Sequence, residues 1–345
     1  MKAPFIWFGG KRRVADVIWA ALGDVDNYVE PFAGSLAVLL ERPTWHTGRT
    51  ETVNDADRFL ANFWRALSQA PDEVARWCDW PVNEADLFAR HLWLVNEGRE
   101  ALSVIDGDPD AFDAKVAGWW VWGLNSWIGS GWCSGNGPWK NLGGAGKGVN
   151  RKRPHLGHAG QGVNRKLPHL GDAGKGVNRK LPHLGGAGQG VSLLVPRNEG
   201  LWSYLREIAH RLRHVRVCCG DWSRVVTEGA LSYGSAVGVF LDPPYLATVR
   251  TAGLYSTDSD DVAHKVRRWA LEHGDDKRLR IVLAGYETEH ASEMPSSWRV
   301  HAYSASAAYQ SSKADGANQA NRKLERLWFS PGCLAADSGQ AGLFA

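Results

Sequence analysis

The chain has 345 residues, of which 44% are hydrophobic and 22% are charged, and its formal net charge is +3. These values are typical of a folded protein with one large domain and an insertion, and they exclude a small disulfide scaffold and a wholly disordered chain. The five cysteines are scattered without C-x-x-C spacing, and the sequence shows neither a signal peptide nor an apolar run of the ~18 residues that cross a bilayer. We therefore predict a cytoplasmic protein with no zinc site, no disulfide framework and no membrane span.

In chain order, seven short runs of apolar and β-branched residues are typical of β-strands. They span 28–32, 50–53, 215–219, 236–241, 280–283, 299–303 and 327–330. Stretches with helical spacing follow several of these runs, at 35–42, 56–70 and 258–272. Strands and helices that alternate in this way predict a doubly wound α/β sheet, which binds ligands at the carboxyl ends of its strands.

The alternation is broken by an insertion that reads first as helices and then as a repeat. Helical spacing at 84–97, entered through Asn83, and at 110–127, entered through Pro109, predicts a helical subdomain over 57–128. The resulting boundaries are 1–56 and 214–333 for the main domain, 57–213 for the insertion and 334–345 for a flexible tail. We expect the protein to be monomeric.

A basic 14-residue repeat occupies residues 145–191, with the consensus Ala-Gly-Lys/Gln-Gly-Val-Asn-Arg-Lys-x-Pro-His-Leu-Gly-x. It has nine Lys or Arg and one acid, so its formal charge is +8. Because the formal charge of the whole chain is +3, the rest of the chain has a formal charge of −5. Its glycines and prolines exclude a regular helix, and its charge favours a loop that contacts phosphate groups. The candidate DNA-binding side chains are Lys147, Arg151, Lys152, Arg165, Lys166, Arg179 and Lys180. The alternative is a slipped-strand expansion without function; repetition alone explains the histidines, so no metal site is predicted.

The most specific signal is a strand that ends in Asp242, Pro243, Pro244 and Tyr245. Two prolines restrict the backbone just after the strand, so the Asp242 carboxylate and the Pro243 carbonyl can face one point, which suits an amino group. Two acceptors around an aromatic amine favour its pyramidal, nucleophilic form, and a tyrosine can stack on a base that has left the duplex. The alternative is a strand stopped by a Pro-Pro turn with an aspartate cap.

These residues belong to a series of motifs that resembles the Dam-type family of DNA adenine methyltransferases. The series comprises W-F-G-G-K at 7–11, E-P-F-A-G at 30–34, N-D at 54–55, D-P-P-Y at 242–245 and the closing strand at 322–331. The resemblance implies a class I S-adenosylmethionine-dependent methyltransferase fold, a Rossmann-like doubly wound mixed sheet. It implies transfer of a methyl group from S-adenosylmethionine to N6 of a flipped adenine in double-stranded DNA. The main domain would then be catalytic, and the insertion would recognise the target.

The resemblance also implies a set of cofactor-binding residues. They are Trp7, Lys11, Glu30, Phe32, Gly34, Asp55, Asp221 and Trp222. Gly34 falls at the first strand-to-helix turn, where a missing side chain admits the cofactor, and Asp55 ends the second strand, where an acid can accept ribose hydroxyls. We expect Lys11 to pair with the cofactor carboxylate. The family has a second glycine where this chain has Leu36, which predicts a looser turn or a displaced cofactor and leaves a modified donor open.

Two other classes of function remain open at this stage. The enzyme could act on cytosine N4 or on adenine in RNA, or the chain could be a catalytically silent nucleic-acid-binding protein. A tryptophan cluster invites a base-stacking role, but the i, i+3 spacing of two of its members favours core packing. The cluster comprises Trp119, Trp120, Trp122, Trp127, Trp132 and Trp139, and the spacing is that of Trp119 and Trp122. The sequence leaves open the DNA target, a modified donor, and a role in a restriction system or a phage.

Overall fold

The computed structural model describes residues 1–5, 7, 11–45, 48–105, 108, 110–127, 132–133, 199–244, 261–303 and 325–335. The basic repeat at 145–191 and Tyr245 therefore lie outside the described residues. No helix in the described part is long and apolar enough to cross a membrane.

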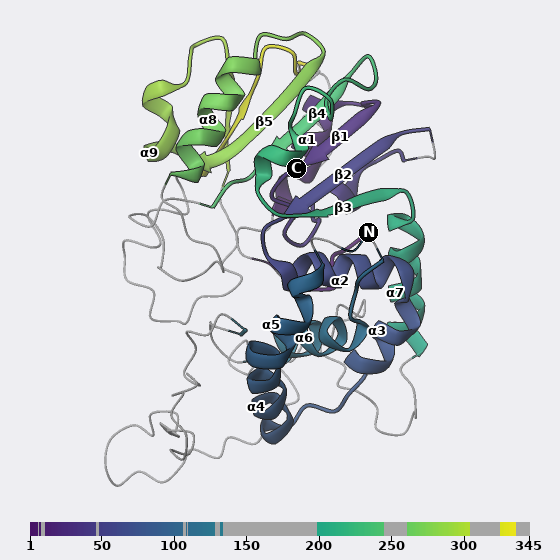
Figure 1. Ribbon diagram of the computed structural model, residues 1–345. Coiled ribbons are helices and arrows are strands. Elements are labelled where there is room, and N and C mark those ends of the chain that lie inside the picture. The colour runs from purple at the N-terminus through teal and green to yellow at the C-terminus, as the bar shows by residue number, and fades with distance from the viewer. Residues whose placement is uncertain are drawn as a thin grey trace, which may run out of the picture.

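The centre of the molecule is a seven-stranded sheet with the order β3-β2-β1-β4-β5-β7-β6 (Figure 1). The strands are β1 (Asn27–Glu30), β2 (Thr50–Asp55), β3 (Val215–Cys219), β4 (Val237–Leu241), β5 (Leu279–Tyr286), β6 (Arg299–Ala302) and β7 (Glu325–Phe329). β1 to β5 pair in parallel, whereas β7 runs antiparallel to both β5 and β6. This mixed α/β sheet agrees with the predicted class I methyltransferase fold, and each predicted run contributes one strand.

The two faces of the sheet bury alternate residues of each central strand, as the pleat requires. Tyr28 and Phe240 join the hydrophobic cluster that includes residues of α1 (Ala15–Leu22), α2 (Arg58–Gln69) and α7 (Glu199–Leu212). Val29 and Val239 join a second cluster that includes α8 (Val262–His273) and the 3₁₀ turn η5 (Trp222–Val225). Fully burying each of these side chains stabilises the fold by roughly 1.5–3 kcal/mol.

The helices of the insertion gather beside β2 and β3, with α4 farthest from the sheet (Figure 1). They are α2, α3 (Pro71–Cys78), α4 (Glu84–Trp93), α5 (Arg99–Ala101) and α6 (Ala114–Ser126), with a π-helical turn at Leu94–Gly98 and a 3₁₀ turn at Leu102–Val104. Polar side chains cap three of them: Asp57 accepts from the backbone of α2, Asn83 from that of α4 and Asp113 from that of α6. Beyond β5 lie α9 (Glu287–His290) and the 3₁₀ turn η6 (Ala291–Glu293).

The helix expected at 35–42 is wrong. The chain there forms turns and a single 3₁₀ turn, η2 (Leu39–Glu41). Gly34 and Leu36 have φ values of 47° and 55°, which no right-handed helix contains. Leu36, Val38, Leu39 and Leu40 are all buried, so the apolar spacing that suggested a helix comes from a turn embedded in the core.

The tryptophans of α6 pack in the core, as their spacing predicted. Trp120 and Trp122 are buried, and the indole of Trp122 donates to the backbone carbonyl of Trp80. Trp132 donates to the carbonyl of Trp120 and lies against Gly123, where an added Cβ would come within 1.8 Å of its ring. These rings hold the insertion helices together.

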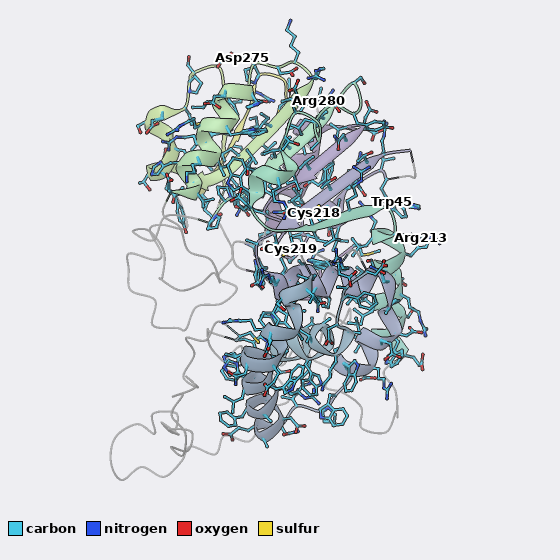
Figure 2. The ribbon with its side chains drawn as sticks, in the orientation of Figure 1. Trp45, Arg213, Cys218, Cys219, Asp275 and Arg280 are labelled. Carbon is cyan, nitrogen blue, oxygen red and sulfur yellow. The ribbon has the colours of Figure 1, made fainter. Side chains whose placement is uncertain are left out.

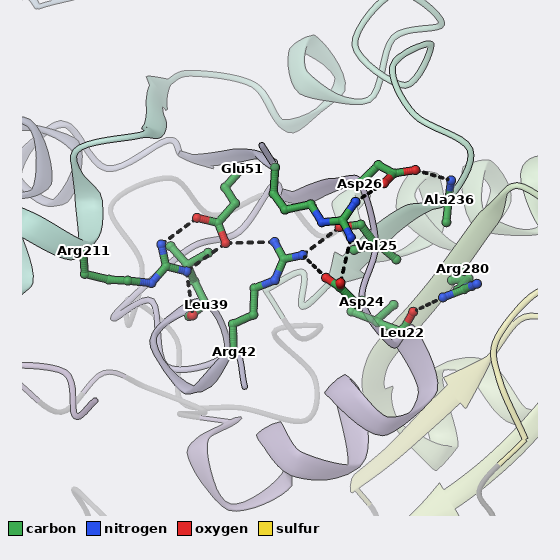
Figure 3. Close-up of polar contacts among 11 residues, drawn as sticks. Leu22, Asp24, Val25, Asp26, Leu39, Arg42, Glu51, Arg211, Ala236 and Arg280 are labelled. Atoms are coloured by element: carbon green, nitrogen blue, oxygen red, sulfur yellow. Dashed lines mark hydrogen bonds and ion pairs between the residues drawn. The ribbon is translucent and has the colours of Figure 1, made fainter. Parts of the chain in front are cut away.

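A buried ionic network joins the C-terminal end of the insertion to the sheet (Figure 3). Glu51 of β2 accepts from Arg42 at 2.9 Å and from two nitrogens of Arg211, at 2.6 and 2.8 Å. Arg211 belongs to α7 and lies 160 positions from Glu51. Removing one partner of such a buried pair typically destabilises a protein by ~3–5 kcal/mol, so this network strongly ties α7 to β2.

Candidate active site

A cavity of about 140 Å³ opens at the carboxyl ends of β1, β2, β3 and β4. A single ordered water needs only ~10–15 Å³, so the space suits a ligand of many atoms. β1 and β4 are neighbours, yet the chain leaves β1 toward β2 and β4 toward β5. Ligands of open α/β sheets bind at such a reversal of strand order.

The structure brings all eight predicted cofactor residues into the wall of this cavity. Those residues are Trp7, Lys11, Glu30, Phe32, Gly34, Asp55, Asp221 and Trp222. Asp242 and Pro244 line it as well, whereas Pro243 does not. The roles predicted for Tyr245 and for the basic side chains of the repeat fall on residues outside the described part of the chain.

Sequence reasoning missed several other lining residues. They are Pro31, Ala33, Ser35, Ala37, Val38, Ala56, Asp57, Gly220, Phe240 and Val262. Most adjoin a predicted motif residue, so their position next to a strand end was the available signal. Val262, the first residue of α8, had no such signal, because only the tertiary fold brings that helix to the cavity.

Three contacts fix Gly34 in the turn that follows β1. Its N–H donates to Asp55 Oδ2 at 3.0 Å, and its carbonyl accepts from the buried indole of Trp64 in α2 at 3.0 Å. A Cβ on Gly34 would lie 2.6 Å from Cδ1 of Trp7, closer than real Cβ contacts come. Glycine is therefore required both by its φ of 47° and by the close approach of Trp7.

Leu36 occupies the position where the family has its second glycine. It keeps a φ of 55°, and its side chain is fully buried in the hydrophobic core rather than in the cavity wall. The left-handed conformation costs about 1–2 kcal/mol for such a residue, while burial of the leucine contributes ~1.5–3 kcal/mol. Burial thus offsets the strain, and the departure from the family pattern leaves the cavity open.

Asp55 ends β2 with both carboxylate oxygens facing backbone donors. Oδ2 accepts from Gly34 and Oδ1 from the Asp57 N–H at 2.9 Å. Burial raises the pKa of Asp55 to about 7, although these hydrogen bonds favour the charged form. Each carboxylate oxygen has a second lone pair, so Asp55 can still accept from ligand hydroxyls.

Lys11 and Asp242 form an ion pair inside the cavity, with 2.9 Å between Nζ and Oδ1. Lys11 is 3% exposed and Asp242 is 19% exposed, so solvent screens the pair only weakly. In the structure, the Lys11 ammonium pairs with the acid of the D-P-P-Y loop. The contact expected between Lys11 and the cofactor carboxylate stays a prediction. This contact orients the Asp242 carboxylate at the end of β4.

Glu30 ends β1 and lies almost completely buried beside this pair, with 2% exposure. Its Oε2 accepts from the hydroxyl of Tyr28 at 3.0 Å. Burial raises the pKa of Glu30 to about 8; the Tyr28 hydrogen bond acts against this rise and the charge of Asp242 adds to it. Glu30 is therefore the cavity acid that most readily holds a proton at neutral pH.

Aromatic rings form another wall of the cavity, beyond the end of β3, where Cys218 and Cys219 lie (Figure 2). The Phe32 and Trp222 rings are stacked, with centroids 6.2 Å apart and planes 28° apart. Asp221 caps η5 by accepting from the Ser223 N–H at 2.9 Å. This wall suits a flat apolar group such as a purine ring. Within the described ranges, no group of three or more His, Cys, Asp or Glu could hold a metal ion.

Residues 7–85 match the family model of D12 class N6 adenine-specific DNA methyltransferases. This match to part of the chain indicates an adenine-specific DNA methyltransferase. The match confirms the resemblance to Dam-type enzymes. The matched residues include Lys11, Glu30, the Gly34 turn and Asp55, whereas the D-P-P-Y loop lies outside the match. A search of curated proteins finds no significant match to the chain.

Proposed function

We propose that this methyltransferase transfers a methyl group from S-adenosylmethionine to N6 of a flipped adenine at specific sites in double-stranded DNA. One observation carries the proposal: the Lys11–Asp242 pair and the Gly34 turn open into the same cavity. A donor site and an acceptor for the reacting amine thus share one enclosed space.

The cavity wall fits S-adenosylmethionine residue by residue. The Gly34 turn, where an added Cβ would meet Trp7, would leave room for the methionine end, and Asp55 would accept the ribose hydroxyls. Phe32 and Trp222 would flank the adenine. When bound, the cofactor supplies an electrophilic sulfonium methyl group.

Asp242 then acts on the target amine. Its carboxylate accepts a hydrogen bond from N6 and stabilises the positive charge that develops on that nitrogen as it attacks the methyl group. Lys11 holds the Asp242 carboxylate in one orientation, so little reorganisation is needed during the reaction. The Pro243 carbonyl is the second acceptor, and Tyr245 stacks on the flipped base, which offsets part of the unstacking free energy.

The basic repeat would position the duplex by contacts to phosphates, which carry no base information. The choice of target sequence then depends on other side chains of the insertion. The restriction-system and phage contexts named above are compatible with this function, and a cytoplasmic monomer remains our expectation.

Methyl transfer to duplex DNA by the Asp242→Ala variant tests the proposal. We expect transfer to be lost, while S-adenosylmethionine binding stays within about tenfold, because the carboxylate contacts the amine rather than the cofactor. Lys11→Met should lower turnover in the same way, since Asp242 then loses the cation that orients it.

Asp275→Ala is the matched control, because this exposed acid precedes the amino end of β5, opposite the cavity (Figure 2). Turnover in Asp242→Ala equal to that in Asp275→Ala would refute the role of Asp242. The modified nucleoside identifies the substrate: N4-methylcytosine, or methylation of RNA only, would support the alternative enzymes.

A further inference from the structure

The described wall of the cavity has more acid than base. Glu30, Asp55 and Asp242 line it, and Glu30 is the most buried of the three, whereas Lys11 is the one cation among the described residues that line it. Lys11 lies on Asp242 at 2.9 Å. In the described chain, no Lys or Arg nitrogen lies within 4 Å of a carboxylate oxygen of Glu30 or Asp55.

Glu30 is the less compensated of these two acids. Asp55 accepts backbone N–H groups on both oxygens, whereas the charges that act most strongly on Glu30 are those of two other acids, Asp242 just after β4 and Glu51 on β2. The groups that favour its charged form are the Tyr28 hydroxyl and the backbone N–H of Leu39. A buried carboxylate in this setting stays protonated until a positive charge arrives.

We propose that Glu30 is the residue by which the cavity distinguishes the cationic methyl donor from its neutral product: donor binding expels a proton from Glu30, and product binding does not. This inference rests on the proposed cofactor and names the means of its recognition. S-adenosylmethionine has a sulfonium that becomes an uncharged thioether in S-adenosylhomocysteine, and the two molecules are otherwise alike.

The position of Glu30 relative to the reacting atoms supports this assignment. The methyl group must pass from the sulfur to an amine held at Asp242, so a bound donor would have its sulfonium between the Gly34 turn and the end of β4. Glu30 lies at the end of β1, which pairs with β4, and its carboxyl is influenced by Asp242. The charge of Asp242 is already balanced by Lys11, which leaves Glu30 to balance the sulfonium.

The proton balance is complete over the reaction. Donor binding converts the neutral Glu30 carboxyl to a carboxylate and releases one proton to solvent. In the transfer step the S–C bond would break with its electron pair on sulfur, the N6 lone pair would form the N–C bond, and N6 would lose one proton to solvent. The sulfonium charge has then gone, so Glu30 takes up a proton from solvent, and each turnover releases one net proton.

The sign of the pH dependence follows from the pKa of Glu30, which burial raises to about 8. Below this pH the unliganded protein holds the proton that the donor must displace, so donor affinity falls as the pH falls. Product affinity does not depend on this group. Proton exchange at Asp55, and at the amino group that both ligands share, is common to both complexes, so it cancels in the ratio of the two affinities.

Isothermal titration calorimetry in two buffers of different ionisation enthalpy tests the proposal on the full chain. At pH 7, we expect S-adenosylmethionine to release about 0.9 proton more than S-adenosylhomocysteine, since a group with a pKa of about 8 is mostly protonated there. Sinefungin, which has an ammonium in place of the sulfonium, should behave like the donor. The donor-to-product affinity ratio should fall toward tenfold per pH unit below pH 8.

Three variants separate a specific role of Glu30 from a structural one. Glu30→Gln keeps the shape but should abolish the proton release and the pH dependence of the affinity ratio. Tyr28→Phe removes the donor to the carboxylate, so the pH dependence should move to higher pH while the ring stays in the core. Asp275→Asn, at an exposed acid that does not line the cavity, should leave the difference in proton release unchanged.

The outcomes distinguish this proposal from the proposed function. Equal proton release by donor and product, or an unchanged difference in Glu30→Gln, would overturn the role of Glu30 while leaving the cofactor assignment intact. Failure of the wild-type protein to bind either ligand would overturn the cofactor assignment itself. A melting temperature measured for each variant shows that it is folded.

Discussion

Gly34→Ala is the sharpest test of the cofactor turn, because two separate effects act at this residue. An alanine there must adopt a φ of 47°, which costs about 1–2 kcal/mol for an L-residue. Its Cβ would also lie 2.6 Å from Trp7 Cδ1, ~1 Å inside the optimal carbon–carbon distance of ~3.5–4.0 Å.

The contact with Trp7 should be the larger effect. Leu36, two residues away, already tolerates a φ of 55° when its side chain is well packed, so left-handed backbone alone does not exclude a side chain here. Trp7 is packed edge-on against Phe5 and tilted against Trp120, with both ring centroids 5.9 Å away. Displacing a packed side chain typically costs ~1–3 kcal/mol, so the total is ~2–5 kcal/mol.

Gly34 and Trp7 both line the cavity, so the strain would distort its wall. We therefore expect Gly34→Ala to weaken S-adenosylmethionine binding at least about thirtyfold, which corresponds to ~2 kcal/mol. Calorimetry measures the affinity, and the melting temperature reports the share of the strain that appears as lost stability. Gly229→Ala is the control, since an added Cβ there meets no atom within 4 Å.

The double variant Trp7→Ala with Gly34→Ala separates the two effects. If the contact dominates, the double variant should bind the cofactor better than the sum of the single effects predicts, because the alanine at position 34 no longer meets an indole. Gly34→Ala that binds within twofold of wild type would refute the close approach of Trp7, and strict additivity would assign the loss to backbone strain.

Two further predictions address the ribose site and the repeat. Asp55→Ala should weaken S-adenosylmethionine binding by ~1–3 kcal/mol, the usual effect of unpairing buried hydrogen-bonding groups, and unchanged affinity in calorimetry would place the ribose elsewhere. Deleting 159–172, one repeat unit that contains Arg165 and Lys166, should lower DNA affinity and reduce the log–log salt slope by ~0.9 for each lost phosphate contact. An unchanged slope over ~50 to 200 mM salt would make the repeat a spacer, and a changed methylation motif would make it part of the target reader.

The sequence alone determined that the acids of the motifs meet at the cavity, because the chemistry of a doubly wound sheet is concentrated at strand ends. Glu30, Asp55, Asp221 and Asp242 each end or follow a strand that could be recognised by its apolar run. Parallel strands bring those ends to one edge, so the strand pattern, together with the family resemblance that singled out these acids, sufficed to place them in one cavity.

Local patterns failed where tertiary contacts, and not the spacing of apolar residues, determine the conformation of a segment. The residues from 35 to 42 have helical spacing, yet the positive φ values of Gly34 and Leu36 turn the chain around the cavity. The Leu36 side chain points into a core that is formed by segments far apart in the sequence. The spacing of residues within one segment does not indicate such a contact.

The contacts that tune the chemistry were decided only by the tertiary structure. Lys11 pairs with Asp242, the Trp64 indole of the insertion holds the Gly34 carbonyl, and Arg211 ties α7 to β2. Each contact joins residues from different elements, and neither composition nor spacing identifies the partner of a given charge or donor. The physical reason is that periodicity encodes the face on which a side chain lies, whereas its partner, burial and pKa depend on how the whole chain closes around it.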